Sequence, residues 1–384
     1  MALTGWPLLG LLLVLCVALP GAALVGWSRL RPRLIGRLVV VVLLIAGQLA
    51  AVGLAAAAVN RGGSYYTSWS QVLATFSKPP AVHQGVSRGS GTAAGGNTPE
   101  TAGSLAGQNV KSFSTPTEWA TKGKLESVTI TGASSGLVSH AFVYLPPQYF
   151  QKQYLHTRFP AAEVFTGYPG NDHNLVQALD YPGVLLREIA GGRARPMALV
   201  MMRTSLSYHR DLECTNVPSG PQTQTFLADD VISAMSRHFR VWSVGWGAIG
   251  DSTGGYCATK MAMTSPTAYR AAVSLSGYYH ALQDRTTGDL YAGSPVVRDL
   301  NDLTWRLQHL PAPAISLLVT ISKEETGPLG YGDTMRFIAQ AKDPLRIDSI
   351  ISPHGGHNFQ AWDALLPQSL DWLSAKLNAP GSSR

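Results

Sequence analysis

The stretch Val241–Ala258, VWSVGWGAIGDSTGGYCA, decides the fold of this chain. An apolar run, Val241–Ile249, ends at Gly250-Asp251-Ser252-Thr253-Gly254, and a segment that can be helical begins at Tyr256. A strand, a G-x-S-x-G turn and a helix in this order are what a nucleophile elbow requires. The turn is tight enough to exclude side chains at its glycines, and its serine takes a strained backbone conformation. The pattern therefore predicts an exposed Ser252 hydroxyl at a helix N-terminus.

The segments on either side of this turn predict an α/β fold with a mostly parallel central sheet. Apolar runs typical of buried strands alternate with segments that can be helical, which indicates a sheet covered by helices on both faces. The expected strands are 127–130, 140–145, 160–165, 197–202, 241–249, 269–275, 315–321 and 347–351, and the expected helices are 181–190, 224–239, 256–264, 334–341 and 362–377.

The N-terminal part of the chain predicts a transmembrane helical hairpin over residues 1–61. Residues 1–28 hold no charged side chain, and a second uncharged run covers Leu38–Val59. Each is near the roughly 20 residues that cross a bilayer as a helix, so we expect helices at about 4–26 and 38–59. Four arginines lie between them, and positively charged loops stay in the cytoplasm. Everything after the hairpin is then extracytoplasmic. A cleaved signal peptide is the alternative for the first run, although it lacks the usual positively charged start.

Composition excludes several classes of function. The net charge is +7, but four arginines fall in the first sixty residues, which hold no acid, and the remainder carries 26 basic and 23 acidic residues. Such a balance offers no electrostatic footprint for nucleic acid. No C-x-x-C is present, so we expect no structural zinc, and no metal or cofactor. In an extracytoplasmic domain Cys214 and Cys257 are expected to form a disulfide, two unpaired buried thiols being the alternative.

Residues 62–123 read as an extracytoplasmic linker. The stretch Gly89–Gly107, GSGTAAGGNTPETAGSLAG, is small, polar and aperiodic, which is typical of flexible connections. A globular domain is expected over 124–384. Within it, Gln283–Arg306 has no pattern that predicts an element.

Two loops late in the chain supply candidates for the rest of a catalytic triad. An α/β-hydrolase orders its triad as serine, then acid, then histidine, with the last two in loops after later strands. SKEE, residues 322–325, follows one expected strand, and SPHGGHNF, residues 352–359, follows the last. His357 is the expected general base rather than His354, because Gly355-Gly356 lets the backbone present the next residue. The expected acid is Glu325, with Glu324 as second choice and Asp333 after it.

The oxyanion hole of such a site needs two backbone N–H donors. One belongs to the residue after the nucleophile, here Thr253, and the other lies in the loop after the third strand of the fold. Thr166-Gly167-Tyr168-Pro169-Gly170 follows the expected strand 160–165. The N–H of Tyr168 is the second candidate, since Pro169 has no N–H.

From about residue 125 to 378 the chain resembles the esterase D / antigen 85 mycolyltransferase branch of the α/β-hydrolases. The similar motifs are EVFTGYPGNDHN at 163–174, TSLSYHRDLECTN at 204–216, GDSTGGYCATKMAMTSPTAYRAAVSLSGYY at 250–279 and PHGGHNFQAW at 353–362. In order, they match the family's oxyanion loop, its loop after the fourth strand, its elbow with the following helix and strand, and its histidine loop. The resemblance implies a serine esterase or acyltransferase acting on an ester or acyl-lipid, including a cell-envelope glycolipid.

Two departures bear on the acyl group. Where the mycolyltransferases carry an arginine beside the oxyanion residue, this chain has Pro169, and their tryptophan after the histidine is replaced by Asn358-Phe359. Trehalose mycolylation therefore does not follow from the resemblance. The expected function is a membrane-anchored extracytoplasmic serine esterase or acyltransferase that works through an acyl-enzyme on Ser252. The alternatives are a catalytically silent relative that binds carbohydrate or matrix, and a hairpin with its own function in a membrane complex.

Overall fold

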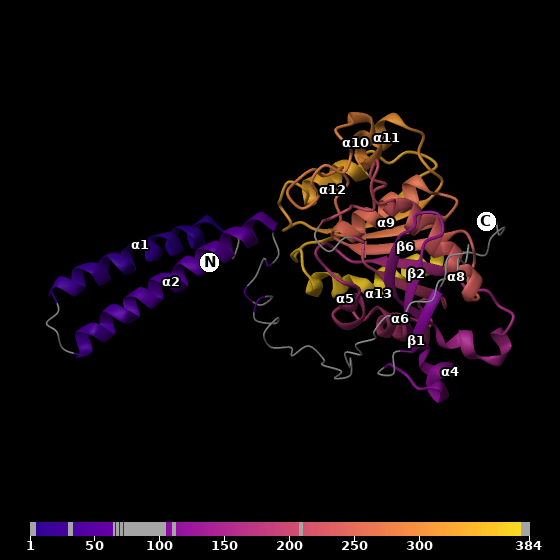
Figure 1. The fold of residues 1–384 in the computed structure, drawn as a ribbon, viewed down its shortest axis with the longest axis horizontal. Helices are drawn as coiled ribbons and strands as arrows, with labels where there is room; N and C mark the ends of the chain where they lie inside the picture. Colours follow the sequence, from indigo (N-terminus) through magenta and orange to yellow (C-terminus); the bar gives the residue numbers. More distant parts are fainter. Residues whose placement is uncertain are drawn as a thin grey trace. The chain divides into compact units, whose positions relative to one another are not determined.

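The computed structural model describes residues 5–29, 34–63, 66, 69, 72, 105–109, 113–206 and 210–377. The N-terminal helices and the sheet domain are described separately below. Figure 1 gives the order of their elements along the chain.

Two apolar helices, α1 (Trp6–Arg29) and α2 (Leu34–Gly63), open the chain. The apolar spans Trp6–Trp27 and Gly36–Arg61 are long and apolar enough to cross a membrane, judged by length and composition. The Arg61 guanidinium lies 4.2 Å from the centroid of the Trp6 ring, so the end of α2 meets the start of α1. The helices thus pack antiparallel, as Figure 1 shows. Both expected helices are present: α1 is shifted by two to three residues toward the C-terminus, and α2 is four residues longer at each end.

The sheet of the described residues has nine strands in the order β1-β2-β3-β5-β4-β6-β7-β8-β9. The pairs β1/β2, β2/β3 and β3/β5 are antiparallel, and the pairs from β5 through β4, β6 and β7 to β8 are parallel. The strands are β1 Leu105–Asn109, β2 Lys124–Thr131, β3 Val138–Leu145, β4 Ala161–Phe165, β5 Ala198–Met202, β6 Trp246–Asp251, β7 Tyr269–Leu275, β8 Ser316–Ser322 and β9 Arg346–Ser352.

Helices cover both faces of this sheet, because side chains of successive strand residues point to opposite faces. On β3, Ala141 and Val143 pack with the residues of α8 and α9, whereas Phe142 and Tyr144 pack with those of α6 and α13. Figure 1 shows α9 and α13 on opposite sides of β6. The expected α/β class with a mostly parallel sheet is confirmed. The larger helices are α5 Asp172–Gln177, α6 Tyr181–Ala190, α8 Ile232–His238, α9 Thr253–Thr264, α10 Pro295–Asn301, α11 Leu303–His309, α12 Tyr331–Ile338 and α13 Phe359–Lys376.

The strand before the elbow is shorter and later than expected. β6 begins at Trp246, and Val241 makes only an isolated bridge to Phe159. Gly245 has φ +71°, a left-handed conformation that interrupts an extended strand. At the other end α9 begins at Thr253 rather than at Tyr256, because close backbone packing overrides the low helix propensity of Gly254-Gly255.

The sheet begins before residue 124, inside the range expected to be a linker. β1 (Leu105–Asn109) pairs antiparallel with β2, Leu105 facing Ile130. Its sequence, LAGQN, has small and polar residues without a period of two, so the pattern of side chains carries no strand signal. The pairing is made by backbone groups along the edge of β2, and a strand of this kind is specified by its partner rather than by its own residues.

Two further helical segments differ from expectation. The helix expected over 224–239 is divided into a short turn α7 (Thr223–Thr225), a π-helical stretch Phe226–Val231 and α8. The patternless segment 283–306 contains α10 and the start of α11. Their first turns are capped by Ser294, which accepts from Val297 N–H, and by Asp302, which accepts from Trp305 N–H. Local capping rather than a long apolar period defines these helices.

A disulfide joins the loop after β5 to α9. The sulfurs of Cys214 and Cys257 are bonded, and the two residues lie 43 positions apart in sequence. Both side chains are fully buried. Because Cys257 is one turn beyond Thr253 on α9, the bond ties this loop to the helix that follows the nucleophile elbow.

We expect the double substitution Cys214→Ser/Cys257→Ser to lower stability by roughly 2–4 kcal/mol, since the bond closes a long loop in the unfolded chain. Thermal unfolding of the purified chain, followed by circular dichroism, measures the change in Tm. Cys16→Ser is the matched control, because Cys16 on α1 is not part of the disulfide, and it should leave the transition unchanged. An unaltered Tm in the double variant would contradict a stabilising bond.

Candidate active site

Ser252 occupies the turn between β6 and α9 in a strained backbone conformation. Its φ is +54° and its ψ is −121°, a region that non-glycine residues rarely occupy and that concentrates at functional sites. Neighbouring elements hold it there: the Ser252 N–H donates to the Leu275 carbonyl at 2.9 Å. The Ser252 carbonyl accepts from the N–H groups of Gly255 at 2.9 Å and Tyr256 at 3.1 Å. The elbow is therefore built as the G-x-S-x-G pattern predicts.

The glycines of the elbow are required by the approach of neighbouring backbone. A Cβ placed on Gly254 would lie 2.3 Å from the Phe165 carbonyl oxygen, at the end of β4. A Cβ on Gly250 would lie 2.5 Å from the Gly254 carbonyl group. Both distances are shorter than any real contact, and the obstacles are backbone atoms that cannot rotate away. Strand, turn and helix can meet here only if these two positions carry no side chain.

The loop after β4 lies against the elbow. The Gly167 N–H donates to Asp251 Oδ2 at 3.0 Å, and a Cβ on Gly167 would stand 3.0 Å from the Ser252 Cβ. Tyr168 is the next residue of this loop, and Thr253 opens α9 directly after Ser252. Among the described residues, neither the Tyr168 N–H nor the Thr253 N–H has a protein acceptor. Two donors beside a serine, one at the positive end of a helix, can stabilise an oxyanion.

The loops after β8 and β9 pair Glu325 with His357. His357 Nδ1 lies 2.8 Å from Glu325 Oε2. The second carboxylate oxygen of Glu325 accepts from the Ser322 N–H at 3.3 Å. Glu325 is 4% exposed, so this carboxylate is fixed in place and shielded from water. A buried acid bonded to Nδ1 orients an imidazole and stabilises its protonated form.

The neighbouring pair in the same loops has a different environment. His354 Nδ1 lies 3.0 Å from Glu324 Oε1, and the Gly355 N–H donates to the other Glu324 oxygen. The His354 side chain is 83% exposed. Exposed pairs of this kind contribute little to stability. Glu324 thus binds the other histidine of the loop, and this environment distinguishes the two adjacent glutamates.

Asp333, the third candidate acid, contacts a different histidine. His280 lies between two carboxylates, its Nδ1 at 2.9 Å from Asp302 and its Nε2 at 2.7 Å from Asp333. The hydrogen bonds that His280 donates to these two carboxylates raise its pKa to about 10, so it is charged at neutral pH. The cluster links α11, α12 and the segment after β7.

Sequence reasoning missed a buried polar cluster behind the elbow. Asp211, Glu213 and Lys260 are each at most 3% exposed. Two of them lie in TSLSYHRDLECTN, where the D-x-E spacing was the available signal, and Lys260 lies on α9. No group of three or more His, Cys, Asp or Glu residues suited to a metal ion occurs in the part of the chain that the structure describes.

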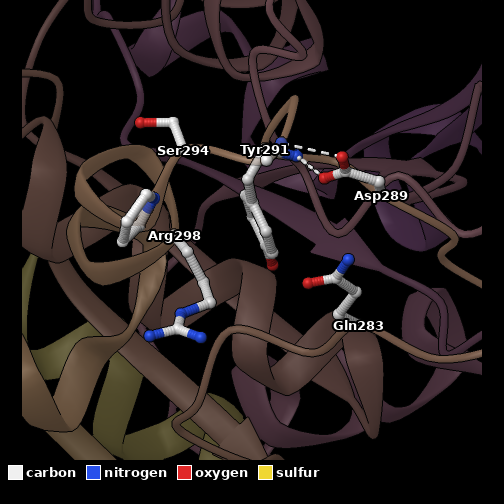
Figure 2. Close-up of a pocket in the computed structure, with 7 residues that line it drawn as sticks. Gln283, Asp289, Tyr291, Ser294 and Arg298 are labelled. Atoms are coloured by element: carbon white, nitrogen blue, oxygen red, sulfur yellow. Dashed lines mark hydrogen bonds between the residues drawn. The ribbon is translucent and has the colours of Figure 1, made fainter.

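A pocket of about 130 Å³ lies in the segment before α10. Figure 2 shows the Tyr291 side chain extending between Arg298 and Gln283, and the Asp289 carboxylate facing the backbone. Asp289 accepts from the N–H groups of Tyr291 at 2.9 Å and Gly293 at 2.8 Å. The Tyr291 hydroxyl also lies 3.3 Å from Glu213 Oε2, so the pocket is in contact with the buried cluster.

Solved structures with the same fold include two enzymes. An S-formylglutathione hydrolase from Agrobacterium tumefaciens superposes with a TM-score of 0.57 at 13% identity, covering 67% of this chain and 97% of that one. A ferulic acid esterase superposes with a TM-score of 0.54 at 15% identity, covering 67% of this chain and 99% of that one. At such low identity these likenesses show the fold, which is that of the α/β-hydrolases.

One curated relative is an uncharacterized protein of Corynebacterium glutamicum, 22% identical over 277 residues. The match covers 66% of this chain and 62% of that protein, so the chain spans about three fifths of the length of this relative. The family described as "Putative esterase" matches residues 133–370, which is more than half of the chain and includes the elbow and both later loops. The chain therefore belongs to this esterase family, and its sheet domain has the α/β-hydrolase fold.

Proposed function

We propose that this chain is a membrane-anchored, extracytoplasmic serine esterase or acyltransferase whose triad is Ser252, His357 and Glu325. The observation that carries the proposal is the 2.8 Å contact between His357 Nδ1 and a buried carboxylate, combined with the strained serine of the elbow. The order of the three residues along the chain is that of the α/β-hydrolases.

The topology of the sheet supports the same assignment. β6, β7 and β8 are parallel neighbours, and β9 is next to β8. Carboxyl ends of parallel strands share one edge of a sheet, and active sites of open α/β sheets lie at this edge. Ser252 follows β6, the acid loop follows β8 and the histidine loop follows β9. The proposed nucleophile and the proposed acid thus each follow the carboxyl end of a parallel strand.

The proposed reaction proceeds in two steps, acylation and deacylation of Ser252. The Ser252 oxygen attacks the ester carbonyl carbon while its proton passes to His357, and the negative oxygen that forms is stabilised by the N–H groups of Tyr168 and Thr253. The carbon–oxygen bond of the ester then breaks, and the leaving alcohol takes the proton from His357. Water or a second alcohol repeats the sequence on the acyl-enzyme and releases the acid or a new ester. Glu325 keeps its charge and holds the imidazole.

The substrate class proposed is an ester with an acyl chain, including an acyl-lipid or glycolipid of the cell envelope. The family supports ester chemistry, and the resemblance to the mycolyltransferase branch supports an acyl acceptor that is an alcohol. The place of Pro169 and of Asn358-Phe359 in the two loops argues against trehalose as the recognised sugar. The anchor would keep the enzyme at the membrane surface where such lipids occur.

The proposed orientation places the loop between α1 and α2 in the cytoplasm and the esterase domain outside. Four arginines in and beside that loop favour retention on the cytoplasmic side. The Cys214–Cys257 disulfide fits an oxidising compartment, because cytosolic thiols are kept reduced.

Glu325→Gln should lower kcat for p-nitrophenyl butyrate by roughly three to four orders of magnitude, because an amide favours the wrong tautomer of the histidine. Glu324→Gln is the matched control: the same chemical change one residue away should leave kcat within about twofold, since exposed pairs contribute little. His357→Ala and His354→Ala form a second matched pair with the same expected ranking. A larger loss for Glu324 or His354 than for its neighbour would contradict the assignment.

The orientation is tested by cysteine labelling in intact cells, in a background in which Cys16 is replaced by serine. A membrane-impermeant maleimide should react with Thr101→Cys without lysis, and with Pro32→Cys only after the membrane is opened. Neither change removes a charge from the arginine cluster. Labelling of Pro32→Cys in intact cells, with Thr101→Cys protected, would reverse the proposed topology.

A further inference from the structure

One face of α9 lies along the loop after β5. Thr253, Cys257 and Lys260 are spaced four and three residues apart, so they share a helix face. Along the loop segment Asp211–Thr215 they meet successive partners: Thr253 contacts Asp211, Cys257 is bonded to Cys214, and Lys260 Nζ donates to Thr215 Oγ1 at 2.7 Å. This loop is therefore fastened to the helix that begins at the proposed oxyanion donor.

The Thr253 side chain is held by two buried partners. Its hydroxyl donates to Asp211 Oδ2 at 3.2 Å, and the Tyr278 hydroxyl oxygen lies 3.3 Å from its Oγ1. The same Tyr278 oxygen lies 2.6 Å from Glu213 Oε1. Ser205 donates to the other oxygen of Asp211 at 3.0 Å. Glu213, Tyr278, Thr253 and Asp211 thus form a hydrogen-bonded series, and all four are at most 7% exposed.

The direction in which these four residues donate their hydrogen bonds depends on whether Glu213 is protonated. Tyr278 has one hydrogen. If Glu213 is ionised, that hydrogen goes to the carboxylate, and Thr253 Oγ1 receives none from Tyr278. If Glu213 is protonated, it donates to Tyr278, Tyr278 donates to Thr253, and Thr253 donates to Asp211. Only the second arrangement gives Thr253 both a donor and an acceptor, and hydrogen bonds aligned in one direction strengthen each other.

We propose that Tyr278, Glu213 and Asp211 are positioning residues for the oxyanion hole, acting through Thr253 and aligned by the proton on Glu213. They fix the Thr253 side chain, and thereby the first peptide group of α9, whose N–H is a proposed oxyanion donor. Ionised Glu213 would weaken the hole twice: it withdraws the Tyr278 hydrogen from Thr253 and places negative charge behind a developing oxyanion. The inference rests on the proposed function, which assigns that N–H to the oxyanion.

The surroundings of Glu213 favour its proton at neutral pH. Burial raises the pKa of Glu213 to about 8, so the proton is present at pH 7 and is lost as the pH rises through about 8. Lys260 donates to the Glu213 carbonyl oxygen at 2.9 Å. Burial lowers the pKa of Lys260 to about 7. The titratable groups facing Glu213 are Asp211, Tyr256, Lys260, Tyr278 and Tyr291.

The second carboxyl oxygen of Glu213 is satisfied from the pocket side. The Leu282 N–H donates to Glu213 Oε2 at 3.2 Å, and the Tyr291 hydroxyl lies 3.3 Å from the same atom. Tyr291 also donates to the Leu282 carbonyl at 2.9 Å and lines the pocket of Figure 2. The Leu282 N–H requires an acceptor at Oε2, and the short 2.6 Å contact with the Tyr278 oxygen is made by Oε1. The proton of Glu213 therefore belongs on Oε1, where it can be donated to Tyr278.

Steady-state kinetics of the full chain in detergent, with p-nitrophenyl butyrate as the probe substrate, test the proposal. Tyr278→Phe removes the hydroxyl and should lower kcat about tenfold with KM within about twofold, because the interaction lost is one made with the transition state. An unchanged kcat in a folded Tyr278→Phe variant would overturn the proposal. Near-ultraviolet circular dichroism establishes whether the variant is folded.

The pH profile of Glu213→Gln is the second readout, and it tests the proposal even if Tyr278→Phe does not fold. Wild-type kcat should decline on the alkaline side with a midpoint near 8. The amide that replaces the Glu213 carboxyl in this variant donates to Tyr278 at every pH, so the decline should disappear while kcat at pH 7 is retained. Persistence of the same decline would assign it to another group, such as Lys260, and overturn the proposal.

The chain offers a matched control at the other end of β7. The Tyr269 hydroxyl donates to the buried Glu163 Oε2 at 2.9 Å, and burial raises the pKa of Glu163 to about 8. Tyr269→Phe and Glu163→Gln make the same chemical changes away from Thr253 and should leave kcat and its pH profile unchanged. Equal losses in these controls would show a general packing effect and overturn the proposal.

The same assay separates this inference from the proposed function. Activity that survives Ser252→Ala contradicts the serine mechanism itself. Activity that is lost in Ser252→Ala but unchanged in Tyr278→Phe contradicts only the positioning network.

Discussion

The backbone of the nucleophile elbow lies so close to the end of β4 that Gly250 and Gly254 have no room for a side chain. This contact places the start of α9, with Ser252 and Thr253, against the loop that carries Tyr168. The two candidate oxyanion donors come from different parts of the sequence, and only this close packing brings them beside the same serine. The strain at Ser252 is maintained by the hydrogen bonds that its neighbours make across the turn.

The elements that the sequence predicted well are those in which local chemistry and global packing agree. The G-x-S-x-G turn predicted the elbow because glycine spacing reflects backbone contact directly, and α6 begins and ends at the expected residues. β1 could not be predicted, because its residues have no strand pattern and its partner β2 supplies the hydrogen bonds. The bounds of β6 depended on one left-handed glycine, Gly245.

For the candidate site, the sequence ranked Glu325 before Glu324 as the expected acid but kept both as candidates. Glu324 and Glu325 differ by one position, and their separate partners depend on how the two loops fold. The buried cluster of Asp211, Glu213 and Lys260 was missed for a related reason. Charged residues in a loop are usually solvated, and their burial here follows from tertiary contacts with α9 and with the segment after β7.

The proposed mechanism places opposite electrostatic requirements on two buried acids. In the proposed mechanism the buried Glu325 carboxylate faces a histidine that gains positive charge, whereas Glu213 lies behind Thr253, where negative charge would oppose an oxyanion. An ionised acid favours the proposed reaction at the position of Glu325, and a protonated acid favours it at the position of Glu213. Burial supplies the proton at the second position, because it raises the pKa of Glu213.

The central claim, an activated serine at the elbow, is tested most directly by labelling the full chain with a fluorophosphonate and locating the modified residue by peptide mass spectrometry. We expect a single modification on the peptide that contains Ser252, absent from the Ser252→Ala variant of equal stability. A folded wild-type protein that takes no label, or a variant that is still labelled, would contradict a serine mechanism. The fold would then serve to bind a ligand rather than to cleave an ester.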